Sequence, residues 1–507
     1  MELKGSVLQW PADRPWTTRL ILFLLGCVYT TAFAPFGWWL LLPVVMLPVL
    51  YVWLTVSPRD AGWLTFCFGF GIFLSGTYWI YISVVVFGEA PAWLALVLMF
   101  GLVLIMSAYF WLTGWLVSRL AQGEPWLLLI AAPTGWVTIE WLRGFLLTGF
   151  PWLAVGYSQI DSPLAGFAPL FGVYGVSLLT MLSAAAVLVA VFTTGPRRWI
   201  PLAIVVLPWA LGAVLRPVEW TEPDGPPVRT TLLQAGISQD RKWLPEVLRP
   251  TLMFYREATL AARDSQIVLW PEVAIPAVDD RVEAFIGQLQ TDSRATGQTI
   301  LFGILELDSD RGEQRIYNSI MLVDADKRQS YRKRHLVPFG EYFPVPDGVR
   351  EWMRMRNLPH NDLSAGAEVQ PLLVTAGGIP LASAICYEDA YGAEQLYALP
   401  EARVLINVSN DAWFGDSIAP HQHLQIARMR SLEAGRVTVR ATNTGISAFI
   451  DHKGRILDAG AQFEPVTMTA DVQTRRGATP YVNMGNLPVI TFCLLVLAGF
   501  WLRRLSA

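Results

Sequence analysis

Three reactive side chains stand at or near the ends of short apolar runs in the second half of this 507-residue chain. Glu272 ends IVLWPE, Lys333 lies in QSYRKRHLVPFGE, and Cys386 ends LASAIC. A carboxylate, an ammonium and a thiol can together perform acyl transfer. The carboxylate would take the thiol proton, the thiolate would attack a carbonyl carbon, and the ammonium would stabilise the tetrahedral intermediate. Taken singly, each has a plainer interpretation: strand-end carboxylates are mostly solvated, and the basic cluster around Lys333 could face water or anionic headgroups.

The composition indicates a membrane protein. The chain is 53% hydrophobic and 16% charged, with a mean hydropathy of +0.40, above the usual range of soluble proteins. A bilayer-spanning helix needs roughly 20 apolar residues, and turn residues divide the long uncharged runs. We therefore predict eight spans, at residues 17–34, 36–56, 61–86, 92–118, 126–142, 163–192, 199–215 and 486–502.

Lysine and arginine in the short loops predict the orientation of these spans. With the N-terminus inside, the inner segments hold nine basic residues and the outer flanks hold two, Arg143 and Arg216. The inner residues are Lys4, Arg14, Arg19, Arg59, Arg119, Arg197, Arg198, Arg503 and Arg504. We expect no cleaved signal peptide, because the first apolar run continues without a small-residue cleavage site. The prediction is a multi-pass protein of the bacterial inner (cytoplasmic) membrane with both termini cytoplasmic.

Three regions follow from this topology. Residues 1–216 form a transmembrane domain with seven spans, residues 217–484 form a periplasmic catalytic domain, and residues 485–507 form the eighth helix and a cytoplasmic tail. Cys386 is the only cysteine within 217–484, so no second cysteine is present there for a disulfide. A lone cysteine is often just a small buried hydrophobe, but an exported one beside acidic residues favours a nucleophile.

The exported region reads as an α/β fold. A proline-rich linker at 216–228 is followed by short β-rich runs that alternate with helical patterns. Apolar strands covered by helices form layered α/β folds, in which chemistry gathers just past the strand ends. The predicted strands lie at 228–237, 267–272, 299–305, 317–323, 381–386, 403–409 and 437–443, and the predicted helices near 245–263, 280–295 and 420–436.

The same residues carry a resemblance. WPE with Glu272, YRKRHLVPFGE with Lys333 and ICYE with Cys386 resemble the three signature elements of the nitrilase (carbon–nitrogen hydrolase) superfamily, over roughly residues 228–472. The segment NVSNDAWFGDSIAPHQHLQIARMRSLEAGR, the segment EWLRGFLLTGFPW and the multi-span region are similar to the apolipoprotein N-acyltransferase family in particular. That second resemblance covers nearly the whole chain.

The resemblance implies an αββα sandwich with Glu272, Lys333 and Cys386 as the catalytic triad. It also implies supporting roles: Glu341 would support the triad, Tyr387 and Glu388 would line the thiol pocket, and Trp243 and Asn318 would contribute to activity. The implied reaction moves a fatty acyl chain from a phospholipid to the α-amine of a diacylglyceryl-cysteine apolipoprotein, in lipoprotein maturation. A thioester on Cys386 would carry the acyl chain between the two substrates in ping-pong fashion, without a cofactor.

Other polar constellations have weaker interpretations. His421 and His423, two positions apart without a clear third ligand, are more typical of a helix start than of a metal site, so we expect no metal. Asp411 and Asp416 would shape a loop near the thiol, with Trp413 packing beside them. Glu140 and Arg143, at the outer end of the fifth span, are either a structural ion pair or part of a lipid headgroup site, and both alternatives stay open.

Two other classes of protein must be weighed. A membrane-anchored amidase or nitrilase-type hydrolase would give its thioester to water, and a transporter would use the outer domain only to bind ligand. The transporter predicts charged or broken helices at the membrane midplane, and the first four spans carry almost no charge. We expect a monomer with no nucleic-acid partner. We also predict that residues 341–362, where apolar and arginine side chains alternate, form a membrane-facing lid.

Overall fold

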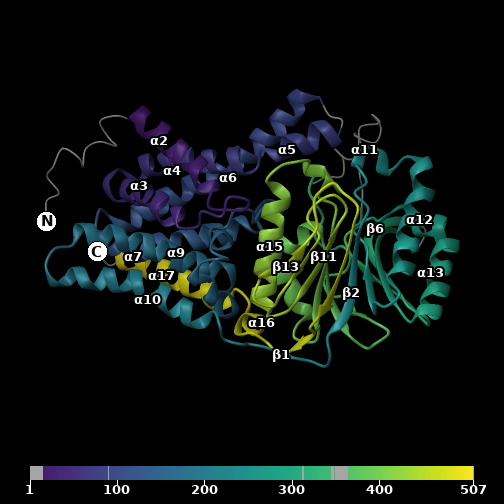
Figure 1. Ribbon diagram of the computed structural model, residues 1–507. Helices are drawn as coiled ribbons and strands as arrows, with labels where there is room; N and C mark the ends of the chain where they lie inside the picture. Colours follow the sequence, from purple (N-terminus) through teal and green to yellow (C-terminus); the bar gives the residue numbers. More distant parts are fainter. Residues whose placement is uncertain (1–14, 89–90, 311–312, 344–347, 349–362, 506–507) are drawn as a thin grey trace. The chain divides into compact units, whose positions relative to one another are not determined.

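The computed structural model describes residues 15–88, 91–310, 313–343, 348 and 363–505 (Figure 1). They divide into two compact units. Unit 1 comprises residues 1–219, 416–425 and 479–507, and unit 2 comprises residues 220–415 and 426–478. Most of the predicted lid at 341–362 lies outside the described residues, so its conformation stays a prediction.

Unit 1 is built of apolar helices. Among its described residues, three helical stretches are long and apolar enough to cross a membrane: Ala92–Ala121, Pro163–Phe192 and Pro196–Leu215. Pro58–Gly76 with Trp79–Val86 would be a fourth, bent by 47°, and three further apolar helices are shorter. The main helices are α2 (Pro15–Thr30), α3 (Leu41–Thr55), α4 (Pro58–Gly76), α5 (Trp79–Ile82), α6 (Ala92–Ala121), α7 (Pro125–Arg143), α9 (Ala168–Phe192), α10 (Trp199–Leu215) and α17 (Leu487–Leu505).

Two predicted spans differ from the helices observed. The predicted span 61–86 is broken, because α4 ends at Gly76, and both the backbone amide and the hydroxyl of Thr77 bond to the carbonyl of Phe73. The predicted span 36–56 begins later, at Leu41, because the chain before it forms turns in which Gly37 has a φ of +69°. A positive φ suits glycine and does not continue a right-handed helix.

Glycines allow the helices of unit 1 to pack closely. A Cβ atom on Gly26 of α2 would lie 2.1 Å from the carbonyl oxygen of Phe68 in α4, and one on Gly71 of α4 would lie 2.1 Å from the carbonyl oxygen of Phe23. Small residues at helix contacts are typical of membrane proteins, where association depends on close packing rather than on the hydrophobic effect.

Unit 2 contains two large mixed sheets. The seven-stranded sheet has the order β14-β2-β3-β5-β6-β7 with β4 on β5, and the six-stranded sheet has the order β13-β12-β11-β10-β9-β8. The first sheet contains β2 (Val228–Gln234), β3 (Ile267–Leu269), β4 (Ile275–Val278), β5 (Thr299–Asp310), β6 (Glu313–Val323), β7 (Arg328–Arg332) and β14 (Val466–Val472). The second contains β8 (Leu373–Val374), β9 (Pro380–Ile385), β10 (Val404–Ser409), β11 (Thr438–Thr442), β12 (Ala448–Ile450) and β13 (Ile456–Ala459).

The two sheets of unit 2 enclose the core between them. Leu269 and Leu301 of the first sheet and Ile385 and Ile406 of the second belong to one buried cluster. Helices α12 (Pro245–Ala261) and α13 (Glu283–Thr296) cover the outer face of the seven-stranded sheet, where a second buried cluster lies. The part of helix α15 (Ala419–Ala434) that belongs to unit 2, residues 426–434, runs along the six-stranded sheet (Figure 1). The result is the layered α/β sandwich predicted from the sequence.

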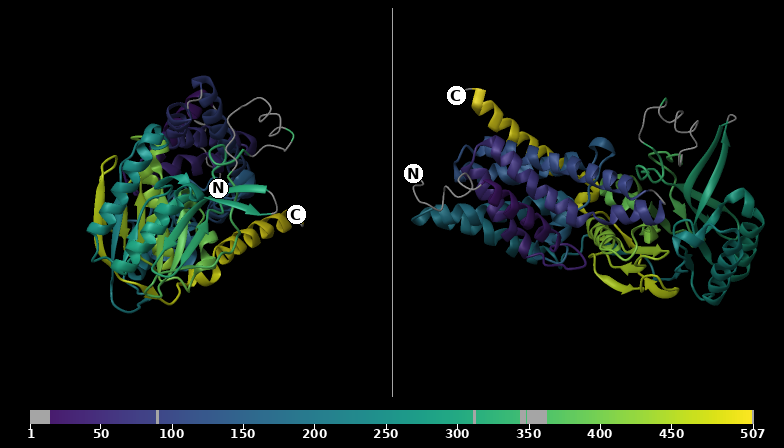
Figure 2. Two further views of the ribbon diagram at one scale, coloured as in Figure 1. Left: turned by 90° about the vertical axis from the view of Figure 1, so that its right-hand side faces the viewer. Right: turned by 90° about the horizontal axis from the view of Figure 1, so that it is seen from above.

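Several strands exceed their predicted limits. β5 and β6 form a long antiparallel hairpin, registered from Ile300 opposite Val323 to Asp310 opposite Glu313 (Figure 2). The predicted linker 216–228 contains a short strand, β1 (Glu222–Pro223), paired with β15 (Arg475–Arg476). Proline and charge made this stretch look like a linker, but backbone pairing with a distant segment is not visible in local sequence.

Candidate active site

Cys386 stands at the turn that follows β9. Its φ of +54° places a non-glycine residue in the left-handed region, where strain is typical of functional sites. The side chain is 9% exposed and belongs to the core between the sheets. The short helix η6 (Cys386–Ala390) begins at this residue. The strand and the turn therefore hold the thiol in one orientation at the end of a central strand.

Glu388 anchors this turn to the segment that carries Lys333. Its carboxylate accepts hydrogen bonds from the backbone amides of Ile385 at 2.7 Å and Arg334 at 2.7 Å, and from the Tyr331 hydroxyl at 3.0 Å. Burial raises the pKa of Glu388, and the two amides oppose the rise. These bonds make Glu388 an anchor between two loops of the site; that it also lines the thiol pocket stays a prediction.

The loop that carries Glu272 is fixed on both sides. Trp270 stacks on Tyr255 of α12 with 4.8 Å between ring centroids, and its indole nitrogen donates to the Thr259 hydroxyl at 3.0 Å. On the other side, the amide of Gly303 in β5 donates to the carbonyl of Pro271 at 3.0 Å. Glu272 is 6% exposed as a residue, so a buried carboxylate is held at the end of β3.

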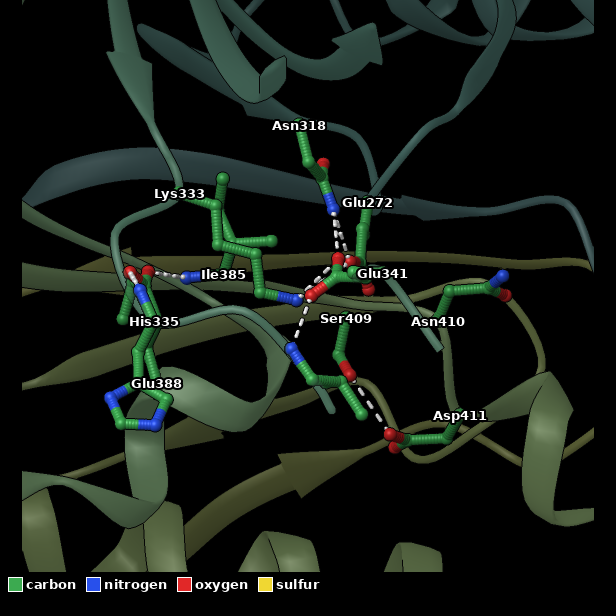
Figure 3. A network of polar contacts seen from close by, with 12 residues as sticks. Glu272, Asn318, Lys333, His335, Glu341, Ile385, Glu388, Ser409, Asn410 and Asp411 are labelled. Atoms are coloured by element: carbon green, nitrogen blue, oxygen red, sulfur yellow. Dashed lines mark hydrogen bonds and ion pairs between the residues drawn. The ribbon is translucent and has the colours of Figure 1, made fainter. Parts of the chain in front are cut away.

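Lys333 lies between two carboxylates (Figure 3). Its Nζ is 2.8 Å from Glu341 Oε1 and 3.5 Å from Glu272 Oε1. The Asn318 amide nitrogen donates to the same two oxygens, at 2.7 Å to Glu272 and 3.0 Å to Glu341. Burial alone would lower the pKa of Lys333, but the two carboxylates and the Cys386 thiol outweigh it and raise that pKa. Lys333 is therefore a charged ammonium at neutral pH.

The thiol is protonated at rest. Burial raises the pKa of Cys386 well above its ordinary value, and the Glu272 carboxylate raises it further, whereas Lys333 lowers it. The charges of Glu272 and Lys333 thus act in opposite directions on the pKa of this thiol. A thiol in this state needs a base at the moment of attack.

The structure places the remaining predicted residues at the edges of this cluster. Trp243 follows α11 (Gln239–Lys242) and is 49% exposed. The Tyr387 ring packs edge-on against Tyr391, with 5.1 Å between centroids. Trp413 lies in the short helix η8 (Asp411–Phe414) and is partly buried. The roles that the resemblance implies for these three residues stay predictions.

Two buried cations, Lys242 and Arg440, were not predicted from the sequence. Lys242 is 2% exposed, and its Nζ donates to the backbone carbonyl of Glu272 at 3.2 Å. Arg440, in the middle of β11, is 0% exposed. In the sequence both look like ordinary surface charges, and only the long-range pairing of the strands reveals their burial.

Glu140 and Arg143 of unit 1 hold a loop. Glu140 Oε1 accepts from the backbone amide of Val155 at 2.8 Å, and Arg143 donates to the carbonyls of Phe150 at 2.7 Å and Trp152 at 2.6 Å. Each therefore bonds to the backbone of residues 150–155. These three bonds fasten the loop to α7, which is a structural role; the lipid headgroup site stays the other alternative.

Comparison with known proteins defines the class first. The family model described as "Carbon-nitrogen hydrolase" matches residues 229–481, the region that holds Glu272, Lys333 and Cys386. The chain also resembles the structure of a Nesterenkonia AN1 amidase from the nitrilase superfamily, with a TM-score of 0.39 and 18% identity, over 53% of this chain and 98% of the amidase. The family match places unit 2 in the carbon–nitrogen hydrolase superfamily.

The particular family follows from the remaining matches. A second family model, "Apolipoprotein N-acyltransferase N-terminal domain", matches residues 25–186. The apolipoprotein N-acyltransferase of Methylococcus capsulatus is 40% identical over 94% of this chain and 95% of its own length. That of Nitrosomonas europaea is 41% identical over 95% of this chain and 97% of its own length. The chain belongs to the apolipoprotein N-acyltransferase family.

Proposed function

We propose that this chain moves a fatty acyl chain from a phospholipid, through a thioester on Cys386, to the α-amine of the diacylglyceryl-cysteine of apolipoproteins. Family membership supports the overall reaction. The observation that carries the mechanism is the position of Cys386, at a strained turn where the charges of Glu272 and Lys333 both act on its thiol. Each of the three residues comes from a different strand end of unit 2.

The first half-reaction forms the thioester. Glu272 takes the thiol proton as Sγ bonds to the carbonyl carbon of the phospholipid ester, and negative charge develops on the carbonyl oxygen. The ammonium of Lys333, held by Glu341 at 2.8 Å, stabilises that charge. The ester C–O bond then breaks, and Glu272 returns the proton to the departing lysophospholipid oxygen.

The second half-reaction forms the amide. The α-amine of the acceptor attacks the thioester carbon, Glu272 removes a proton from the nitrogen, and the C–S bond breaks. The thiolate leaves and regains its proton, which restores the resting thiol. Because a thioester keeps enough of the reactivity of an ester to acylate an amine, the reaction needs no cofactor, and the two substrates can come in turn.

The membrane arrangement is part of the proposal. Eight spans would tether the catalytic domain, residues 217–484, at both ends on the periplasmic face of the inner membrane, with residues 1–216 and 485–507 holding the spans and both termini cytoplasmic. The apolar helices of unit 1 support membrane insertion. We propose that the protein acts as a monomer, because each triad residue is supplied by this chain.

The test is the mass of the Cys386 peptide. Purified protein in detergent is mixed with phospholipid, digested and analysed. We expect an added acyl group on Cys386 and one lysophospholipid released per enzyme, and Cys386→Ser should show neither, because a hydroxyl is a far poorer nucleophile at neutral pH. An unmodified Cys386 peptide beside continued lysophospholipid release would overturn the assignment of the nucleophile.

A second measurement separates the transferase from the hydrolase alternative. After acylation, a diacylglyceryl peptide with a free α-amine is added, and amide product and free fatty acid are both quantified. A transferase consumes the thioester mainly as amide. Release of free fatty acid at the same rate with and without the peptide would indicate a hydrolase instead.

A further inference from the structure

Arg440 is a buried cation for which the mechanism above has no use. It lies in β11 of unit 2, opposite Asn407 of the parallel strand β10, and is 0% exposed. Burying a guanidinium is costly unless it is paired and hydrogen-bonded. Its partners therefore indicate what the arginine is for.

Those partners lie on the two loops that follow the central strands. One guanidinium nitrogen, Nη2, is 2.9 Å from Asp411 Oδ2, and the other, Nη1, is 3.5 Å from Asp389 Oδ2 and also donates to Asn407 Oδ1. Asp389 is three residues after Cys386 in η6, and Asp411 follows the end of β10. A planar guanidinium can hold two carboxylates at once in a fixed geometry, which an ammonium cannot. Arg440 thus joins the nucleophile turn to the neighbouring loop.

A chain of side chains continues from Arg440 to the thiol. The Ser409 hydroxyl donates to Asp411 Oδ1 at 2.8 Å, and interaction with Ser409 lowers the pKa of the Cys386 thiol. Figure 3 shows Ser409 and Asp411 joined beside the Lys333 network. By fixing Asp411, the guanidinium fixes the direction in which the Ser409 hydroxyl donates.

The site around Asp411 is closely fitted. A Cβ atom on Gly445 would lie 2.4 Å from Asp411 Oδ2 and 2.7 Å from Asp411 Cβ, so only a glycine leaves room for the carboxylate. The negative charge of Asp411 also opposes formation of a thiolate at Cys386. An adjacent buried cation offsets that charge, and its removal would leave two buried carboxylates uncompensated next to the nucleophile.

We propose that Arg440 is a positioning residue for acyl transfer: by pairing with Asp389 and Asp411 it holds the nucleophile turn and the Ser409 hydroxyl, and so aims Cys386 Sγ between Glu272 and Lys333. This role of Arg440 depends on the proposed function only in the identity of the substrate. The placement of the thiol can be tested without any lipid.

The test compares Arg440→Lys and Arg440→Met with the wild type in two assays. The first is the rate at which iodoacetamide alkylates Cys386, followed by the mass of its peptide; the second is acyl-enzyme formation from phospholipid, separated into kcat and KM. Because small displacements of a reacting group are costly, we expect both rates to fall roughly 10- to 100-fold with KM unchanged. The lysine variant keeps the positive charge but loses the planar guanidinium with its two donor groups. It therefore tests the proposal even if the methionine variant fails to fold.

A matched control is Arg436→Met. Arg436 is also 0% exposed, but it donates to the backbone carbonyls of Ala402 at 2.8 Å and Pro400 at 3.1 Å. Its loss should therefore lower the melting temperature without slowing alkylation per folded molecule.

Adding Asp411→Asn to Arg440→Met should recover part of the alkylation rate, because the uncompensated carboxylate is gone. Wild-type alkylation in the Arg440 variants, or equal slowing in Arg436→Met, would overturn the proposal. Failure of phospholipid to acylate the wild type would count only against the proposed function.

Discussion

Gly303 lies in direct contact with the backbone of Glu272. A Cβ atom on Gly303 would be 2.6 Å from Glu272 Cα and 2.3 Å from the amide nitrogen of Val273. Val273 itself has a φ of +44°, which is uncommon for a β-branched residue. The loop that presents the carboxylate is therefore pressed against β5 in a strained conformation, and only a glycine in β5 makes this possible.

Gly303→Ala should displace the carboxylate without removing it. The added methyl group meets backbone atoms that cannot rotate away, so the Glu272 loop must shift. We expect acyl-enzyme formation to fall roughly 10- to 100-fold, the usual effect of displacing a reacting group by about 1 Å. The rate is measured as lysophospholipid release in the first turnover.

Gly287→Ala is the matched control for that variant. Gly287 lies within α13, and the nearest atom to an added Cβ is Arg328 Nη2 at 3.9 Å, so alanine fits there and should raise helix stability by up to about 1 kcal/mol. Its acylation rate should stay that of the wild type. If Gly303→Ala acylates as fast as this control, the close packing is not needed to place Glu272.

The sequence predicted the layered fold and the polar cluster for a physical reason. Short β-rich runs and the residues at their ends are local signals, so Glu272, Lys333 and Cys386 could be placed at strand ends before the structure was known. The burial of Lys242 and Arg440 and the anchoring by Glu388 depend on pairings between distant strands. The break between α4 and α5 also escaped prediction, because the apolar pattern continues through Gly76.

Glu272 and Lys333 should differ in which step they serve. Glu272→Gln keeps the shape of the side chain but removes the base, and acyl-enzyme formation should fall roughly 10²–10⁴-fold. Lys333→Met removes the charge that faces the developing oxyanion and should slow both half-reactions, each by roughly 10²–10³-fold. Single-turnover acylation and amine transfer are measured separately. A Lys333→Met enzyme that acylates normally and fails only in amine transfer would exclude the oxyanion role.

The acylation rate should depend on the charge of the side chain at position 318 more than on its size. Its amide nitrogen lies 2.7 Å from Glu272 Oε1 and 3.0 Å from Glu341 Oε1. Asn318→Asp would replace that donor with a third carboxylate, and crowded carboxylates cannot all ionise, so Glu272 would be held protonated more often. We expect Asn318→Asp to acylate at least about tenfold more slowly than Asn318→Ala, which only removes the donor. Equal rates for the two variants would show that the amide serves mainly to fill space.

We expect the buried ammonium of Lys242 to lower the stability of the fold at neutral pH and to support acylation. Lys242 is 2% exposed, and its ammonium donates to the carbonyl of Glu272 at 3.2 Å. Burial lowers its pKa from 10.5 to about 8, a shift that the Glu272 carboxylate partly opposes. Below pH 8 the lysine is charged in both the folded and the unfolded protein, and the folded protein bears the full cost of burying it. Between about pH 8 and 10.5 the folded protein releases a proton that the unfolded chain keeps, so this cost declines as the pH rises.

Lys242→Met should therefore raise the melting temperature at pH 7 and raise it less at pH 10. The difference between 10.5 and 8 corresponds to about 3 kcal/mol at most, or several degrees, followed by tryptophan fluorescence in detergent. Acylation should fall, because the loop of Glu272 loses a donor. Lys327→Met, at an exposed lysine, should change neither quantity. A lower melting temperature for Lys242→Met at both pH values would show that the ammonium stabilises the fold more than its burial costs.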